Sequence, residues 1–307
     1  MHTAITIDAL KVLDAIDRKG SFAGAAAELF RVPSAISYTV QKLEEDLDLQ
    51  VYDRSGHKAA LTPAGRYLLN EGRALLEAAE NLAHTTRQVA QGWETRLRIG
   101  FNSLIPAQCL FPAIEDFYQL GVPVDVQIVE EVFAGAWDAL QSRRVDMIVG
   151  ADQLSKPAGA FTTKPLGDIP FVFVVAASHP LSGASEPLTN SDIARYPAVV
   201  AADTSRSLPP GNAGIFQRQR TLTVSNIDQK IAAQEAGLGV GWVPLPRVRQ
   251  QLAEGTLVAK TVEDERAPIG LHLARHADDQ GKAMMWFWER LSQDAELKRW
   301  AEAPTDA

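Results

Sequence analysis

The chain has 307 residues, a formal net charge of −8 and a hydrophobic share of 46%. This length exceeds the size at which one hydrophobic core normally stops growing, so we expect two or three domains. The single cysteine, Cys109, excludes an intrachain disulfide framework and a cysteine-rich metal site. Charges interrupt the apolar pattern at the N-terminus and no long apolar run follows, which predicts a cytoplasmic protein without a signal peptide or membrane span.

The first 47 residues are predicted to form three helices. Apolar residues recur with a 3.6-residue period from Ile7 onward, which indicates an amphipathic core helix. Ser21 is a suitable N-cap for a short alanine-rich second helix. The pattern breaks at residues 30–32, and Pro33 then stands at a first helical position, where its missing N–H is tolerated. We therefore expect a tight turn between two short helices.

The helix that begins at Pro33 has two different faces. Its predicted core face repeats at helical spacing and comprises Ile36, Val40, Leu43 and Leu47. Its opposite face carries side chains that hydrogen-bond base edges or phosphates, namely Ser34, Ser37, Tyr38 and Gln41. Such side chains on the first turns of a second helix predict a helix-turn-helix that enters a major groove of DNA.

A basic turn, Arg54-Ser55-Gly56-His57-Lys58, lies between two short predicted strands and is typical of a wing that contacts the DNA backbone. Residues 1–91 carry ten Lys and Arg against twelve Asp and Glu, but phosphate attraction depends on which face the cations occupy. The basic side chains expected to face DNA are Arg31, Lys42, Arg54, His57 and Lys58. The alternative, a helical hairpin with scattered surface charge, fits the periodicity but leaves the basic turn unexplained.

The segment 21–65 resembles the winged helix-turn-helix of LysR-type transcriptional regulators. The matching motifs are Ser21-Phe22, Ala25-Ala26, Ala35-Ile36-Ser37, Leu43-Glu44, Asp53-Arg54 and Leu61-Thr62-Pro63-Ala64-Gly65. Two departures stand in the recognition helix, where Val32-Pro33 replaces the usual Ser-Gln and Tyr38 replaces a common Arg. The resemblance implies DNA binding, and these departures mean that the family's usual base contacts do not carry over.

One long helix is predicted from Thr62, as N-cap, to Gly92. Its apolar stripe continues for about eight turns through Leu68, Leu69, Leu75, Leu76, Leu82 and Val89. A stripe of this length usually pairs with a second helix, so dimerisation through residues 63–91 is expected, with two recognition helices meeting two half-sites. The resemblance implies the same use of this helix. The alternative is a spacer packed on its own chain.

Strands and helices alternate after Gly92, which indicates an α/β fold with a parallel sheet. Strands are predicted at 96–101, 124–129, 146–150, 170–176, 196–202, 222–226, 239–244 and 269–275, and helices at 105–120, 134–143, 227–236 and 280–291. This order resembles the two-lobed, periplasmic-binding-protein-like effector domain of LysR-type regulators. The expected domains are a winged helix-turn-helix at 1–62, a linker helix at 63–92 and an effector domain at 93–300, with lobe I at about 93–168 and 269–300 and lobe II at about 169–268.

Ligands in open α/β sheets lie beyond the carboxyl ends of strands, near helix N-termini. The residues expected there are Asn102, Ser103, Phe133, Ala202, Thr204, Ser225 and Trp242. Three hydroxyls, those of Ser103, Thr204 and Ser225, are predicted polar anchors, although each is also a common helix-capping residue. Two aromatic side chains in this set favour an aromatic effector over a short dicarboxylate.

No motif predicts catalysis, a metal site or a cofactor. The glycines at 237, 239 and 241 follow a helix and precede a strand, the reverse of a dinucleotide-binding loop. His272 and His276 are expected on a strand, where the spacing does not bring two metal ligands together. Cys109 is expected to pack as a small hydrophobe, with a redox-sensor role as the alternative.

The sequence is therefore interpreted as a transcriptional regulator and not an enzyme. Its expected partners are double-stranded DNA with two half-sites, a small-molecule effector, further copies in a homodimer or homotetramer, and RNA polymerase, with no membrane. The alternative is a cytoplasmic small-molecule-binding protein with a degenerate DNA-binding module.

Overall fold

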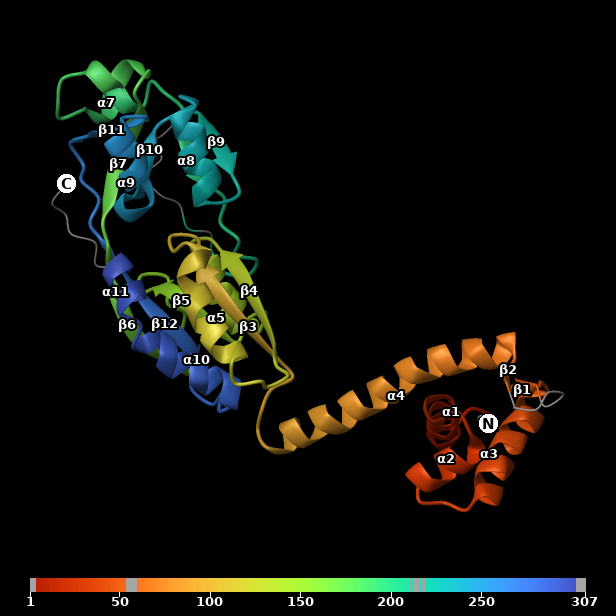
Figure 1. Cartoon of the computed structure of the whole chain (residues 1–307). Coiled ribbons are helices and arrows are strands. Elements are labelled where there is room, and N and C mark those ends of the chain that lie inside the picture. Colours follow the sequence, from red (N-terminus) through yellow and green to blue (C-terminus); the bar gives the residue numbers. More distant parts are fainter. Residues whose placement is uncertain (1–3, 54–59, 210, 212–215, 217–218, 302–307) are drawn as a thin grey trace. The chain divides into compact units, whose positions relative to one another are not determined.

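A computed structural model describes residues 4–53, 60–209, 211, 216 and 219–301. The chain divides into two compact units, residues 1–91 and 92–307, which we call unit 1 and unit 2 (Figure 1). Within the described residues, no helix is both long and apolar enough to cross a membrane.

Unit 1 consists of helices and one small hairpin. Its elements are α1 (Ile7–Lys19), α2 (Phe22–Glu28), α3 (Pro33–Leu47), β1 (Tyr52–Asp53), β2 (Ala60–Leu61) and α4 (Pro63–Ala90). The expected caps are confirmed: the Ser21 hydroxyl accepts a hydrogen bond from the Gly24 amide at 3.0 Å, and Pro33 lies in the first turn of α3. Buried apolar residues of α1, α2 and α3 form one core, which also covers Leu69 of α4.

The hairpin β1–β2 is joined to its neighbouring helices by hydrogen bonds. Glu44 of α3 is only 7% exposed, and its carboxylate accepts hydrogen bonds from the amides of Val51 and Tyr52 at 2.8 and 3.0 Å. Thr62 caps α4 by accepting from the Gly65 amide at 3.0 Å. A Cβ atom at residue 65 would collide with the Val51 carbonyl, so only glycine allows this close approach. These contacts give a physical reason for the Leu-Glu and Leu-Thr-x-x-Gly motifs.

The long helix α4 is buried only at its beginning. Leu69 is 1% exposed, whereas Leu75, Leu82 and Val89 are 52%, 69% and 51% exposed. Between residues 73 and 90, all of them described, no side chain is buried. The apolar stripe therefore lacks a partner in unit 1.

Unit 2 is an α/β structure with two lobes. Its strands are β3 (Arg96–Asn102), β4 (Asp125–Glu131), β5 (Met147–Asp152), β6 (Phe161–Ile169), β7 (Phe171–Ala176), β8 (Ala198–Ala201), β9 (Thr221–Val224), β10 (Gly241–Pro244), β11 (Leu257–Lys260) and β12 (Ile269–His276). Its α-helices are α5 (Phe111–Tyr118), α6 (Gly135–Gln141), α7 (Asn190–Ile193), α8 (Ile227–Glu235), α9 (Leu245–Glu254), α10 (Lys282–Ser292) and α11 (Ala295–Ala301), with 3₁₀ turns η1 (Ala107–Leu110) and η2 (Pro180–Gly183).

We define lobe I by its five-stranded sheet, ordered β4-β3-β5-β12-β6, and lobe II by the sheets β10-β7-β11 and β8-β9. Strand β3 is parallel to β4 and β5, but β12 is antiparallel to β5 and β6. The expectation of a parallel sheet is therefore wrong for the pairs that β12 forms with β5 and β6. Strand β12 returns from lobe II and enters the sheet in the opposite direction. Strands β7, β10 and β11 are also antiparallel. Figure 1 shows α10 along lobe I and α8 and α9 along lobe II.

The helix expected at 105–120 is broken. A 3₁₀ turn follows Pro106, and α5 begins at Phe111 with a proline in its first turn. Prolines lack the amide that a continuous helix would need at these points. Buried Phe117 of α5 packs on Phe287 of α10, with ring centroids 4.8 Å apart, in the core of lobe I.

Candidate functional site

The polar face predicted for the second helix lies on the surface of unit 1. Ser34, Ser37 and Tyr38 are exposed on α3, and Tyr38 has 68% of its surface accessible. Ile36 and Val40 on the opposite side are buried. The N-cap residue of α3 makes no side-chain capping bond, so the first-turn amides are not covered by a cap. Such a helix N-terminus favours a phosphate.

Three other predicted DNA contacts are engaged by carboxylates of unit 1. Arg31 donates two hydrogen bonds to Asp8 of α1 at 2.9 and 2.6 Å, and these bonds hold the pKa of Asp8 below its usual range. Lys42 contacts Asp46 at 2.5 Å, and Gln41 donates to Glu45 at 2.9 Å.

The remaining predicted DNA contacts, Arg54, His57 and Lys58, lie outside the described residues. The strands that precede and follow them are described and pair antiparallel, with Tyr52 opposite Leu61.

Sequence reasoning overlooked two apolar residues in the turn between α2 and α3. Phe30 is 96% exposed and Val32 is 63% exposed. Phe30 also has a φ of 54°, a left-handed conformation that is costly for an aromatic residue. The sequence showed only a break in periodicity here, whereas an exposed, strained aromatic residue beside the predicted recognition helix is a candidate contact.

Unit 2 contains a cavity of about 250 Å³ between its lobes. Four of the predicted effector residues line it, namely Asn102, Ser103, Phe133 and Trp242. Phe133 has a φ of 50°, so a strained backbone supports one cavity wall. Sequence reasoning missed further lining residues, of which Asp152, Phe171, Lys230 and Arg266 are charged or aromatic.

The other three predicted effector residues, Ala202, Thr204 and Ser225, do not line this cavity, and the prediction is corrected for them. The Ala202 amide donates to the Val224 carbonyl at 2.7 Å. Ser225 is exposed, and its amide donates to Gln229 at 2.9 Å. The Thr204 hydroxyl donates to Glu131 and accepts from the Val132 amide at 3.0 Å. The Thr204 hydroxyl is thus engaged within the chain, whereas exposed Ser225 lies outside the cavity lining.

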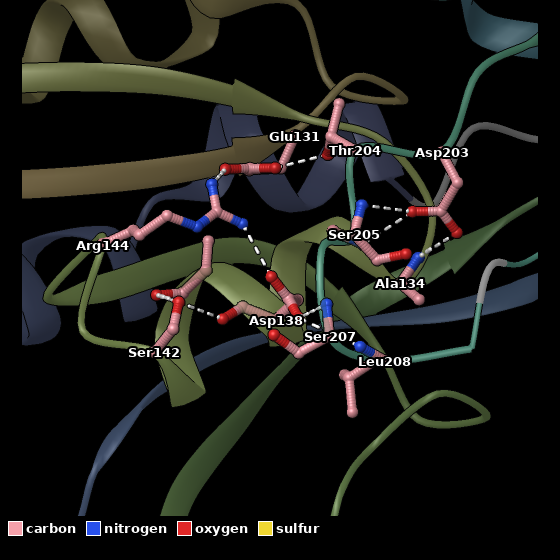
Figure 2. Close-up of polar contacts among 12 residues, drawn as sticks. Glu131, Ala134, Asp138, Ser142, Arg144, Asp203, Thr204, Ser205, Ser207 and Leu208 are labelled. Carbon is pink, nitrogen blue, oxygen red and sulfur yellow. Dashed lines mark hydrogen bonds and ion pairs between the residues drawn. The ribbon is translucent and has the colours of Figure 1, made fainter.

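Thr204 belongs to a dense set of contacts that joins residues 203–208 to lobe I, which we call the interlobe polar cluster (Figure 2). Asp203 accepts hydrogen bonds from the amides of Ala134 and Gly135, at 3.2 and 3.1 Å, at the start of α6. Arg144 contacts Glu131 at 2.6 Å and Asp138 at 3.0 Å.

The Asp138 carboxylate, which contacts Arg144, is bonded to the backbone of the same cluster as well. It also accepts from the amides of Ser207 and Leu208, at 2.8 and 3.1 Å. Burial opposes its ionisation, but these hydrogen bonds and Arg144 outweigh that effect and hold the pKa of Asp138 below its usual range. The cluster thus pairs its buried charges within the chain.

Lys230 and Arg266 differ from the charges of that cluster. Lys230 is 5% exposed, and burial lowers its pKa to about 7 with the nearby Arg266 charge adding to the effect. Arg266 lies over the Phe171 ring, with 4.0 Å between the guanidinium carbon and the ring centroid, and burial lowers its pKa. No carboxylate among the described residues forms an ion pair with either side chain.

Cys109 is half-buried, and burial raises the pKa of its thiol to about 11. A thiol with a raised pKa carries little thiolate near neutrality, which disfavours the redox-sensor alternative.

Two family models match the chain. Residues 7–66 match the bacterial regulatory helix-turn-helix protein of the lysR family, and residues 90–296 match the LysR substrate binding domain. The probable HTH-type transcriptional regulator YhaJ of Escherichia coli (strain K12) is 41% identical over 285 residues, which are 92% of this chain and 94% of that protein. The HTH-type transcriptional regulator PunR of Escherichia coli (strain K12) is 33% identical, covering 97% and 96% of the two chains.

Solved structures agree with this fold. The Corynebacterium glutamicum OxyR C206 mutant superposes with a TM-score of 0.61 at 21% identity, covering 96% of this chain and 95% of that chain. The probable transcriptional regulator PA0477 from Pseudomonas aeruginosa gives 0.59 at 19% identity, covering 94% and 97%.

Proposed function

The chain belongs to the LysR family of transcriptional regulators, and from this membership we propose how the residues of its two units bind DNA and an effector. As a LysR-type regulator it has a helix-turn-helix DNA-binding domain and an effector-binding domain. The comparisons give no support to the alternative of a solute-binding protein with a degenerate DNA-binding module. The following assignments of residues, assembly and effector site are proposals.

The exposed face of α3 is the observation that carries the DNA assignment. Ser34, Ser37 and Tyr38 have no competing role in the core, so we assign base contacts to them. Phe30 and Val32 offer apolar contacts to sugars or thymine methyl groups beside them. Arg31, Lys42 and the wing residues Arg54, His57 and Lys58 are assigned to phosphates.

Selection of bound duplexes from a random-sequence pool tests this assignment. The selected sequence is then used in fluorescence anisotropy with a scrambled duplex as reference. Tyr38→Ala should lower the preference for the selected sequence, because a lost base contact typically costs about 1–3 kcal/mol of discrimination. Arg54→Ala should weaken both duplexes alike and reduce the salt slope by about one. Equal losses on both duplexes for Tyr38→Ala would contradict its role in base reading.

The uncovered stripe of α4 supports a homodimer. Leu75, Leu82 and Val89 are each at least half exposed, and a second copy of α4 would remove their apolar surface from water. A dimer would present two copies of α3 to two half-sites. A tetramer and a contact with RNA polymerase stay predictions without an assigned surface.

Sedimentation velocity tests the dimer. Leu75→Glu together with Leu82→Glu should give monomers with much weaker DNA binding, because each charge would be buried in the helix pair. Glu71→Leu with Glu77→Leu, on exposed positions of the same helix, is a control for altered charge. An unchanged sedimentation coefficient for the Leu75→Glu/Leu82→Glu variant would refute the α4 interface.

The cavity between the lobes is the proposed effector site. Its walls come from both lobes: Asn102 and Ser103 at the end of β3, Phe133 before α6, and Trp242 on β10. A ligand that contacts both lobes can shift the equilibrium between two arrangements of the lobes only to the extent that it binds one arrangement more tightly than the other.

A further inference from the structure

We propose that this cavity binds a small aromatic carboxylate, whose carboxylate group is held by Lys230 and Arg266 and whose ring lies against Phe133, Phe171 and Trp242. The proposal rests on the assignment of the cavity as the effector site and adds the chemical class of the effector. At about 250 Å³ the cavity falls below the usual range of drug-sized sites, so its volume suits a single ring.

The charge balance of the cavity is the first argument. Its charged lining residues are Asp152, Lys230 and Arg266, which leaves one positive charge in excess when Lys230 is protonated. Asp152 is already engaged, since it accepts a hydrogen bond from the Ser155 amide at 2.7 Å. A buried cation without a counter-ion is costly, so an anionic ligand would supply what the described part of the chain does not.

The second argument concerns hydrogen-bond donors. The Lys230 ammonium, the Arg266 guanidinium, the Ser103 hydroxyl and the Asn102 amide nitrogen have no acceptor among the described residues. Arg266 lies over the Phe171 ring, which leaves the edge of its guanidinium free for the two oxygens of a carboxylate. Donors from both lobes thus surround a cavity with too few acceptors.

The third argument is that other anion sites nearby are already filled. The amides at the start of α6 donate to Asp203 of lobe II. A larger hollow of about 410 Å³ shares Phe171, Trp242 and Arg266 with the cavity, but its lysine, Lys260, is paired with Glu186 at 2.7 Å. The unpaired charge is therefore concentrated at Lys230 and Arg266.

Matched pairs of an acid and its amide test the proposal on the full chain. Benzoate and phenylacetate should raise the melting temperature and bind in calorimetry, whereas benzamide and phenylacetamide should bind at least about tenfold more weakly, because a charged hydrogen-bond partner is lost. Inorganic phosphate, which carries charge but no ring, should not compete with benzoate. Failure of both acids to exceed their amides, or protection by phosphate equal to that by benzoate, would overturn the proposal.

Lys230→Met and Arg266→Met test the residues. Each should weaken benzoate at least about tenfold and leave benzamide unchanged. Lys230→Met should also raise the melting temperature of the ligand-free protein by a few degrees, because it removes an unpaired buried charge. This gain shows that the variant folds. Arg249→Met, an exposed position on α9 in the same lobe, is the matched control and should change neither property. Benzoate affinity within twofold of the wild type for Lys230→Met would refute its role.

DNA binding of the same preparations separates this proposal from the general one. The Arg249→Met control should bind the selected duplex as the wild type does. If the wild type binds DNA but does not bind the acids more tightly than their amides, the effector class alone is overturned. If the wild type does not bind DNA, the DNA assignment is overturned.

Discussion

Two regions of unit 2 hold buried charges between the lobes, and they differ in how those charges are paired. In the interlobe polar cluster, Arg144 contacts both Glu131 and Asp138, and Asp203 binds the first amides of α6. In the cavity, Lys230 and Arg266 have no carboxylate partner among the described residues. The first arrangement holds the fold together, whereas the second lowers its stability and favours an anion from outside.

Loss of a cation should therefore have opposite effects on stability in the two regions. Removing Arg144 from the cluster should lower the stability of the protein, whereas removing Lys230 from the cavity should raise it and weaken ligand binding. A protein under selection for stability alone would replace an unpaired buried lysine, so its presence at a cavity indicates a functional use. Unit 1 offers a second example of a buried charge with partners in the chain, because the buried carboxylate of Glu44 accepts hydrogen bonds from two amides.

The largest expected effect comes from Arg144→Met. It leaves Glu131 and Asp138, whose side chains are each 2% exposed, without their cation, which should cost about 3–5 kcal/mol of unfolding free energy. Urea denaturation followed by tryptophan fluorescence measures the loss. The neighbouring Arg143 is 46% exposed and pairs with Asp279, so Arg143→Met should cost less than about 1 kcal/mol. Similar losses in the two variants would remove the distinction between the cluster and the surface.

A second, smaller loss is expected in unit 1 from Glu44→Ala. It leaves the amides of Val51 and Tyr52 without an acceptor, at a cost of about 1–3 kcal/mol. Hydrogen exchange of these two amides should accelerate accordingly. Glu44→Gln keeps an acceptor oxygen and should lose much less, and Glu45→Ala, on an exposed position, serves as the control. Unchanged exchange in Glu44→Ala would show that the hairpin does not depend on this carboxylate.

The pH dependence of benzoate binding sharpens the comparison further. Burial and Arg266 lower the pKa of Lys230 to about 7, whereas a bound carboxylate would raise it again. Affinity should therefore be constant below pH 7 and fall as the pH rises above it, by up to about tenfold per pH unit. The other charged groups that line the cavity are Asp152 and Arg266. Lys230→Met should abolish this slope, and a slope that survives in it would assign the titration to another group.

The stability of the ligand-free protein should also depend on pH through Lys230. The folded-state pKa of Lys230 lies below its ordinary value of 10.5, so the charged form is penalised in the folded state. The stability deficit relative to Lys230→Met is fully present below pH 7 and disappears as the pH rises toward 10.5. Equal stability of the two proteins at pH 6 would contradict the penalty.

The smallest effect is expected for the exposed pair of Asp8 and Arg31. Asp8→Asn frees Arg31 for phosphates, and because exposed pairs are worth about 0–1 kcal/mol, affinity should rise no more than a few-fold on all sequences alike. Fluorescence anisotropy with the selected and scrambled duplexes measures this change. Asp116→Asn, in unit 2, alters the net charge equally and is the control. A gain confined to the selected duplex would indicate that Arg31 reads bases.

Local signals were enough to predict unit 1. Ser21, Pro33 and Thr62 mark helix starts through bonds within three residues, so their role does not depend on the remainder of the chain. The core face of α3 follows from periodicity alone. Elements without such signals were missed, among them α7, α9, α11, β11 and β6, the last an edge strand in which Pro165 and Gly167 interrupt the pattern.

The sequence by itself determined the family, the recognition helix and the alternation of strands and helices, because these depend on motifs and short-range spacing. Tertiary structure decided which charges are paired. Thr204 and Ser225 look like ligand anchors in the sequence, but the fold engages the Thr204 hydroxyl within the chain and leaves Ser225 exposed outside the cavity lining. Lys230 and Arg266 are 36 positions apart and carry no motif, yet the return of the chain from lobe II to lobe I places both at one cavity. Whether a buried charge finds a partner depends on long-range packing, which no local pattern encodes.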